Sequence, residues 1–345
     1  MPRPLRGWCC RGRDSCGDHA AAPSFGLQIP PLQSRAMLRR RDVSLVGLGL
    51  MATTAESQSR RTGRLVVIGG AEDRLHDKVI LKRFTELCGG PGSRIRVLSA
   101  ASSAPERAWD NYQRAFGELG VSDCAPIPVP DRTAADSSAV TDLILEADGI
   151  FISGGDQRRL MDLLWETDAF RALHVAFHLR GCCIGGTSAG AAALSRHMLV
   201  RGEAVRLPEK EAAELDIGLG FIGGAIIDQH FSERGRLARL LSAITQRPEL
   251  LGVGVDEDTA LVIERDSAIE VIGQGAVTLV DARDMKSNNP LIEPGDRLEM
   301  LDVRLHVLPA GHRYSAHEVV QRVQQMPARL RTAIGQLVTP GPIRG

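Results

Sequence analysis

A serine in a glycine-rich turn is the sharpest chemical signal in the sequence. The run Cys182-Cys183-Ile184-Gly185-Gly186-Thr187-Ser188-Ala189-Gly190-Ala191-Ala192-Ala193 joins an apolar segment, a GxSxG turn and small helix-forming residues. In a nucleophile elbow the serine occupies a tight strand-to-helix turn, whose small neighbours permit a strained backbone and leave the hydroxyl exposed. A Gly/Ser-rich turn alone is a weak signal, but this one has the strand and the helix that the motif requires. Ser188 is therefore the predicted nucleophile.

A serine nucleophile needs a base, and the sequence contains nine histidines. His230 closes an apolar segment, which places an imidazole at the carboxyl end of a predicted strand, where Ser188 is also expected. Three other histidines, His174, His178 and His197, lie in helical or post-helical stretches, and we expect them to be surface or core residues. His230 is therefore the predicted base.

An acidic run supplies a carboxylate that could orient this imidazole and stabilise its cation. The predicted strand 251–255 delivers Asp256-Glu257-Asp258 at its carboxyl end, which makes Glu257 a plausible third member. A solvated turn would also explain an acidic run, and Glu203 is a rival for the same role. The residues themselves leave the choice between Glu257 and Glu203 open.

A second glycine-containing loop, Phe151-Ile152-Ser153-Gly154-Gly155-Asp156-Gln157, also ends an apolar strand and begins a helix. Its glycines would let backbone amides approach a tetrahedral intermediate, so amides near Gly155 and of Ala189 are predicted to form an oxyanion hole. Gln157 is expected to face the substrate. Read alone, Gly-Gly-Asp is also typical of a simple turn and helix cap.

A basic cluster formed by Arg234, Arg236 and Arg239 follows His230 on the predicted opening turns of a helix. Positive charge at a helix amino terminus opposes the macrodipole, so helix stability does not explain it. The planar guanidinium group donates two parallel hydrogen bonds to a carboxylate. The cluster therefore predicts an acidic substrate group, with a solvated basic face as the alternative.

The elements that position these residues follow from an alternation of short β-branched segments with helical stretches, the pattern of βαβ units and a parallel sheet. Strands are predicted at 65–68, 95–99, 127–129, 149–153, 182–185, 225–228, 251–255, 261–264, 268–272, 277–280 and 305–308. Helices are predicted at 76–87, 105–119, 139–146, 158–179, 234–246 and 317–334. The later strands are separated by short turns, which predicts antiparallel hairpins on one edge of the sheet.

Composition limits the classes of function. With 345 residues and 43% hydrophobic content the chain can bury a sizeable core, and its formal charge of +0 does not attract nucleic acid. No run approaches the roughly eighteen apolar residues of a membrane-spanning helix. Seven scattered cysteines without metal-ligand spacing predict reduced thiols in a cytoplasmic protein, with no metal or organic cofactor.

The two ends of the chain differ from the middle. Residues 1–60 are rich in Arg, Pro, Ser and Gly, and we expect a disordered extension or translation upstream of a start at Met37 or Met51. The folded domain is expected at 61–315 and a helical tail at 316–345. The segment 39–55 loosely resembles a signal peptide but its apolar part is short, so secretion is the less favoured alternative.

The segments around these residues resemble the cyanophycinase family over roughly residues 63 to 312. The resemblance is carried by Leu65-Val66-Val67-Ile68-Gly69-Gly70-Ala71-Glu72-Asp73, Ser153-Gly154-Gly155-Asp156-Gln157, Gly185-Gly186-Thr187-Ser188-Ala189-Gly190-Ala191, Asp228-Gln229-His230-Phe231, Arg234-Gly235-Arg236-Leu237-Ala238-Arg239-Leu240, Gly254-Val255-Asp256-Glu257-Asp258-Thr259-Ala260 and Leu305-His306-Val307-Leu308-Pro309. Together these motifs are highly specific. The first sixty residues and the tail after Arg313 match nothing in the family pattern.

The resemblance implies a serine exopeptidase that hydrolyses cyanophycin, a polyaspartate carrying arginine on each side-chain carboxyl, to β-Asp-Arg dipeptides through an acyl-enzyme. It implies a Ser-His-Glu triad on a flavodoxin-like sheet related to class I glutamine amidotransferases, in an enzyme that is commonly a homodimer and needs no metal. Residues that match the family's substrate pocket are Gln157, Asp228, Gln229, Arg234, Arg236 and Arg239.

Two other functions remain open at this point. An aspartyl dipeptidase would share the elbow and the sheet but cleave short peptides, and such relatives lack the Arg234-Gly235-Arg236 stretch. A noncatalytic relative of the amidotransferase fold would bind a ligand without turnover, although the presence of every triad residue type at strand ends argues against it.

Overall fold

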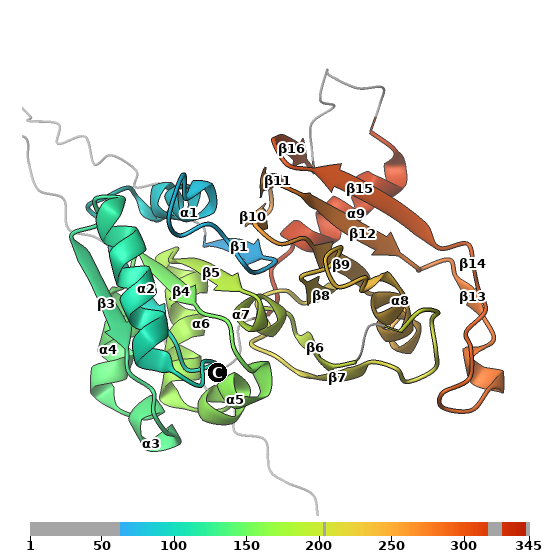
Figure 1. Ribbon diagram of the computed structural model, residues 1–345, viewed down its shortest axis with the longest axis horizontal. Coiled ribbons are helices and arrows are strands. Elements are labelled where there is room, and N and C mark those ends of the chain that lie inside the picture. The colour runs from blue at the N-terminus through green and yellow to red at the C-terminus, as the bar shows by residue number, and fades with distance from the viewer. Residues whose placement is uncertain (1–62, 203–204, 317–325, 343–345) are drawn as a thin grey trace, which may run out of the picture. The chain divides into compact units, whose positions relative to one another are not determined.

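The fold is described for residues 63–202, 205–316 and 326–342 of the computed structural model (Figure 1). The predicted extension at 1–60 and the rival acid Glu203 lie outside the described residues. Residues 317–325 of the predicted tail lie outside them as well.

A large mixed sheet forms the centre of the fold. Across the sheet its strands are β16 (His312–Ser315), β11 (Ala268–Gly273), β10 (Thr259–Glu264), β1 (Arg64–Ile68), β5 (Cys183–Thr187), β4 (Gly149–Ile152), β2 (Arg94–Leu98) and β3 (Asp123–Ile127). From β1 to β3 all neighbours are parallel, whereas β10, β11 and β16 pair antiparallel on the other edge. The predicted α/β class with a mostly parallel sheet is confirmed.

Helices cover both faces of this sheet. On one face α1 (Val79–Cys88) and α2 (Pro105–Glu118) bury Phe84, Tyr112 and Phe116 against Phe151 of β4. On the other face the larger core receives α4 (Ser138–Glu146), α5 (Gln157–Leu164) and α6 (Asp168–Arg180), with the short helix α3 (Arg132–Ala135) beside them. The apolar periodicity of these segments explains why each helix has a buried face.

A second, smaller sheet carries part of the predicted site. Its order is β15 (Arg304–Pro309), β12 (Ala276–Asp281), β9 (Leu251–Val255) and β8 (Ala225–Gln229), with β8 and β9 parallel. Helix α8 (Leu237–Gln246) packs on one face of this sheet (Figure 1). The predicted antiparallel hairpin on the edge of the main sheet is present as β10 and β11, but the predicted strands at 251–255, 277–280 and 305–308 lie in this second sheet instead. The turn between β9 and β10, where Asp258 has a positive φ of 44°, redirects the chain from one sheet to the other.

Short elements complete the fold. They are α7 (Ala189–Ala193), the ribbon of β6 (His197–Arg201) and β7 (Glu214–Ile217), the ribbon of β13 (Lys286–Ser287) and β14 (Met300–Leu301), a 3₁₀ turn η1 (Asn289–Leu291), and α9 (Ala328–Val338). Helix α9 buries Leu330, Ala333 and Ile334 in the larger core, so the described part of the tail packs back onto the domain. No helix in the described ranges is long and apolar enough to cross a membrane.

Several predicted boundaries are wrong for local reasons. The stretch expected as one helix, 158–179, is two helices because Glu166 has a positive φ of 61° and Thr167 caps the second one. Strand β3 lies four residues earlier than expected, at Asp123–Ile127. The helix expected from Arg234 begins only at Leu237, because residues 231–236 form a turn closed by the amide of Arg236 on the carbonyl of Phe231.

Candidate active site

The turn after β5 has the geometry of a nucleophile elbow. Ser188 has φ 51° and ψ −114°, a conformation that non-glycine residues rarely adopt and that costs about 1–3 kcal/mol. The chain enters α7 immediately afterwards, and Gly190 is required there because a Cβ at this position would lie 2.4 Å from the carbonyl oxygen of Ile152. The parallel pairing of Ile68 with Thr187 delivers Ser188 beside the loop that follows β1.

A hydrogen-bonded chain joins the three predicted triad residues. The Oγ atom of Ser188 lies 2.9 Å from Nε2 of His230, and Nδ1 of His230 lies 2.5 Å from Oε1 of Glu257. The imidazole and the carboxylate arrive together because β8 and β9 are parallel neighbours with Gln229 opposite Val255. The nucleophile therefore comes from the main sheet and the other two residues from the second sheet, not from one sheet edge as expected.

The position of the imidazole depends on a glycine. A Cβ at Gly70, which has a φ of +103°, would lie 2.3 Å from Cε1 of His230. The main chain of the same region also holds the histidine, because the amide of His230 donates to the carbonyl of Gly69 at 2.8 Å. The loop after β1 thus shapes the base as well as the cavity in front of the serine.

The environment of His230 favours its neutral form. Burial lowers the pKa of His230 below its ordinary value, and the nearby Arg234 and Arg236 lower it further, while Glu257 opposes them. A neutral imidazole with Glu257 on Nδ1 presents a free lone pair on Nε2 to the serine hydroxyl. This is the state that general-base chemistry needs near neutral pH.

The acidic run divides into three different roles in the structure. Asp256 is buried, and its carboxylate accepts hydrogen bonds from Ser232 and from the amide of Ala276. Asp258 accepts from the amide of Asp73 at 2.9 Å. Only the side chain of Glu257 in this run meets the imidazole, with its own amide held by Glu233. Glu203 lies outside the described residues.

The predicted oxyanion donors flank the serine. A Cβ on Gly154 would lie 3.2 Å from the Cβ of Ser188, so the glycine loop passes directly against Ser188. Within the described ranges the structure gives neither the amide of Gly155 nor that of Ala189 a hydrogen-bond acceptor. Both groups are thus available to a negatively charged oxygen.

The basic cluster is organised around a buried carboxylate. Arg239 donates two hydrogen bonds to Asp228, one of them from Nε at 3.1 Å, and a third to the carbonyl of Gly202. Arg236 lies 3.5 Å from the same carboxylate and donates to the carbonyl of Gln229. Burial lowers the pKa of Arg236 to about 10, so it remains a cation at neutral pH.

The remaining predicted pocket residues differ in whether their polar groups already have hydrogen-bond partners within the chain. The side-chain amide of Gln157 donates to the carbonyls of Leu199 and Val200 in β6, at 3.0 and 2.9 Å. The buried Oε1 of Gln229 has no hydrogen-bond partner among the described residues, which leaves it free to accept from a ligand. Arg234 is exposed and lies before α8.

Sequence reasoning missed a group of polar side chains that line a cavity beside Ser188, near the loop after β1. A cavity of about 200 Å³ is lined by Ser188, Thr187, Gly154, Ser153, Ala108, Ala71, Glu72, Arg74 and Tyr112. The buried carboxylate of Glu72 accepts hydrogen bonds from the hydroxyls of Tyr112 and Thr187, at 2.6 and 2.5 Å. Burial raises the pKa of Tyr112. A glutamate two residues after paired glycines at a strand end could have indicated these polar residues.

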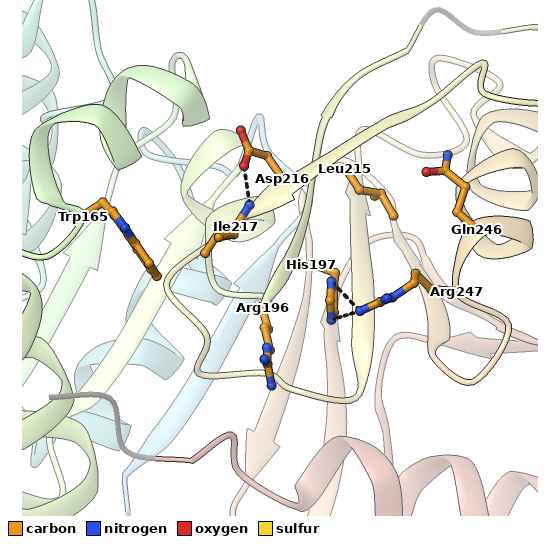
Figure 2. Close-up of a pocket in the computed structure, with 8 residues that line it drawn as sticks. All are labelled: Trp165, Arg196, His197, Leu215, Asp216, Ile217, Gln246 and Arg247. Carbon is orange, nitrogen blue, oxygen red and sulfur yellow. Dashed lines mark hydrogen bonds between the residues drawn. The ribbon is translucent and has the colours of Figure 1, made fainter. Parts of the chain in front are cut away.

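A larger cavity lies apart from these residues. Its volume is about 560 Å³, and it is lined by Trp165, Arg196, His197, Leu215, Asp216, Ile217, Gln246 and Arg247 (Figure 2). Figure 2 shows Arg247 turned toward the ring of His197, which it approaches to 3.0 Å. None of the predicted site residues lines this cavity, so its size does not indicate the reacting centre.

Comparisons with known proteins establish the family of the chain. Residues 65–271 match the model of peptidase family S51, which is more than half of the chain, and the protein belongs to that family. The chain is 40% identical over 252 residues to a cyanophycinase of Geminocystis herdmanii, covering 73% of this chain and 93% of that protein. It is 37% identical over 278 residues to a cyanophycinase of Synechococcus elongatus, covering 80% and 86%. The predicted peptidase class is thereby confirmed.

Solved structures support the fold independently. A peptidase from an acI-B1 Actinobacterium superposes with a TM-score of 0.54 at 22% identity, covering 75% of this chain and 98% of that one. At this identity the likeness shows the fold alone. It confirms the predicted α/β architecture with a mostly parallel sheet flanked by helices.

Proposed function

We propose that the protein is a serine exopeptidase that hydrolyses cyanophycin to β-Asp-Arg dipeptides. The observation that carries this proposal is the hydrogen-bonded chain from Ser188 through His230 to Glu257, on the elbow of a family S51 fold. The curated relatives that match most of the chain are cyanophycinases, which supports the choice of polymer. Glu257 is the proposed third member of the triad.

In the proposed mechanism His230 accepts the proton of Ser188 while the Oγ atom attacks the carbonyl carbon of the scissile bond. The amides of Gly155 and Ala189 donate to the oxygen that becomes negative. The imidazolium, stabilised by Glu257, then gives its proton to the leaving amine and an ester with Ser188 remains. Water that loses a proton to His230 hydrolyses this ester and releases the second product.

The substrate-binding residues are proposed to act in two layers. Gln229, with its unpartnered Oε1, and the exposed Arg234 contact the substrate directly. Asp228, Arg236, Arg239 and Gln157 hold the surrounding chain in shape through their contacts with one another or with β6. A substrate with both carboxylates and guanidinium groups suits such a mixture of acids, amides and arginines.

The test is incubation of the purified protein with insoluble cyanophycin, with turbidity and mass spectrometry as readouts. The wild type is expected to release β-Asp-Arg, and Ser188→Ala to lose at least about 10³-fold of the turnover rate with the fold unchanged. Activity retained in Ser188→Ala would exclude the triad. Intact polymer together with cleavage of short aspartyl peptides would instead support an aspartyl dipeptidase, and turnover of neither would support a noncatalytic binding protein.

We also propose that the protein is a homodimer. Edge strand β15 of the second sheet exposes Leu305 and Val307 on one face, at 48% and 64% of their surface, with Leu301 exposed in nearby β14. A second copy would cover these apolar side chains. Light scattering should give a dimer mass for the wild type and a monomer mass for Leu305→Lys with Val307→Lys; a wild-type monomer excludes the proposal.

A cytoplasmic location is proposed from the state of the thiols. The four described cysteines are free, and three of them, Cys88, Cys182 and Cys183, are buried. Buried free thiols are typical of proteins kept in a reducing compartment. Fractionation of the native host followed by immunoblotting should find the protein with cytoplasmic markers, whereas its presence in the culture medium would contradict the assignment.

A further inference from the structure

The cavity in front of Ser188 continues into a second hollow along the loop after β1. This hollow, of about 290 Å³, is lined by Glu72, Asp73, Arg74, Leu75, His76, Asn111 and Arg114. The two hollows share Glu72 and Arg74 as lining residues. A ligand that extends from the nucleophile in this direction therefore meets the side chain of Arg74 first and that of Arg114 next.

The acidic groups along this path already have partners within the chain. The carboxylate of Asp73 accepts three backbone hydrogen bonds at 2.9 Å, from Leu75, His76 and Lys78. These hydrogen bonds hold the pKa of Asp73 well below its ordinary value. The carboxylate of Glu72 is buried and accepts the hydroxyl protons of Tyr112 and Thr187. Neither acid is arranged primarily to receive a ligand cation.

The basic groups on the same path are arranged differently. The guanidinium of Arg74 lies over the ring of Tyr112, 5.6 Å from its centroid, and comes no closer than 4.0 Å to the carboxylate of Glu72. That separation exceeds hydrogen-bond distance. Arg114 is exposed on α2 and has no carboxylate partner in the described part of the chain. Arg74 has only a 4.0 Å ion pair with Glu72, and Arg114 has no carboxylate partner in the described part of the chain, while the acids on the path already accept hydrogen bonds within the chain.

From this arrangement we propose that the two hollows form a carboxylate-binding subsite, in which Arg74 binds the α-carboxylate of the arginyl group next to the scissile bond. Arg114 binds the carboxylate of the following arginyl group. The proposal rests on the proposed cyanophycin hydrolysis and adds a specificity determinant that none of the predicted pocket residues supplies. Tyr112 and Glu72 are positioning residues, because they fix the plane on which the guanidinium of Arg74 lies.

The experiment compares two short peptides, (β-Asp-Arg)₃ and an analogue in which agmatine, which lacks the α-carboxylate, replaces each arginine. Arg74→Gln is expected to lower kcat/KM on the arginyl peptide about 10- to 100-fold, mainly through KM, because one charge-assisted pair is lost. The same variant should lower kcat/KM on the agmatine analogue by a clearly smaller factor, because that peptide has no carboxylate for Arg74 to bind. Arg74→Lys should restore part of the loss, and Arg114→Gln should give a smaller loss of the same kind.

The matched control is Arg331→Gln, which removes an exposed arginine from α9, outside both hollows. Equal losses on the two peptides in Arg74→Gln would assign Arg74 a structural role and overturn the proposal. No loss on either peptide would overturn it as well. If the wild type cleaves neither peptide, the proposed hydrolysis fails first, so the two failures are distinguishable.

Discussion

Two groups of arginines flank Ser188, and they differ in what their guanidinium groups already bind. On the side of the second sheet, Arg236 and Arg239 converge on the buried Asp228. On the side of the loop after β1, Arg74 and Arg114 lie within hydrogen-bond distance of no described carboxylate. A guanidinium with a buried internal partner mainly stabilises its own chain, whereas one beside an open hollow can serve a ligand.

The largest expected effect comes from breaking the internally paired group. Asp228→Ala should lower the free energy of unfolding by about 3–5 kcal/mol, because Arg239 would be left buried without its counter-charge. Arg114→Ala, in the other group of arginines, should change the free energy of unfolding by no more than about 0.5 kcal/mol. Urea denaturation measures both values. Equal changes in the free energy of unfolding for the two variants would contradict the difference between the two groups of arginines.

A second variant measures how strictly the loop after β1 fixes the position of His230, the proposed base. Gly70→Ala places a methyl group only 2.3 Å from Cε1 of His230, so the imidazole must move. Misplacement of the imidazole by about 1 Å should lower kcat roughly 10²-fold. Circular dichroism should show an unchanged fold, and burst kinetics should show slow acylation. A nearly wild-type kcat would mean that His230 tolerates displacement.

A further pair of variants tests how much the hydrogen bond to the buried carboxylate of Glu72, in the loop after β1, contributes to stability. Tyr112→Phe removes a 2.6 Å hydrogen bond to Glu72 and should lower the free energy of unfolding by about 1–2 kcal/mol. Tyr314→Phe is the matched control, because it changes the only other tyrosine of the chain, which is half-buried on β16. Thermal denaturation of both variants checks the result. A similar loss of stability in both variants would mean that the hydrogen bond to Glu72 contributes nothing specific.

The smallest expected effect is a shift of the pH profile. His230 must be neutral to accept a proton, so kcat/KM should fall as the pH drops through its pKa, which lies below the ordinary value. Arg234 helps to lower that pKa, and Arg234→Gln should therefore move the acid limb toward higher pH. Initial rates between pH 4 and 8 in about half-unit steps would detect the shift. An unmoved or downward-moved limb would contradict this role of Arg234.

The sequence alone predicted β1, β2, β4 and β5 of the main sheet well because their signals are local. A buried strand followed by Gly-Gly-Thr-Ser carries its own turn geometry, and the positive φ of Ser188 follows from the small residues around it. The type of each long helix followed from its apolar period. The short ribbon of β6 and β7 was missed because Glu214–Ile217 has only one half-buried side chain and no continuous apolar pattern.

The partners of charged residues could not be predicted, because they depend on tertiary packing. Arg239 and Asp228 are eleven residues apart on different elements, and nothing in their spacing indicates that they bind each other. Likewise Glu72 meets Thr187 across 115 positions of the chain. A cluster of arginines in the sequence therefore indicates a charge but not whether that charge is available to a ligand.

The division of the proposed triad between two sheets has a consequence for how enzyme activity can be used. Ser188 follows β5, whereas His230 and Glu257 follow β8 and β9 of the other sheet, so the distance of 2.9 Å between hydroxyl and imidazole exists only when the sheets are docked. Turnover is thus a sensitive gauge of native docking. During gentle heating or dilute denaturant, catalysis should disappear before the helical signal does, and refolding yields are best scored by turnover.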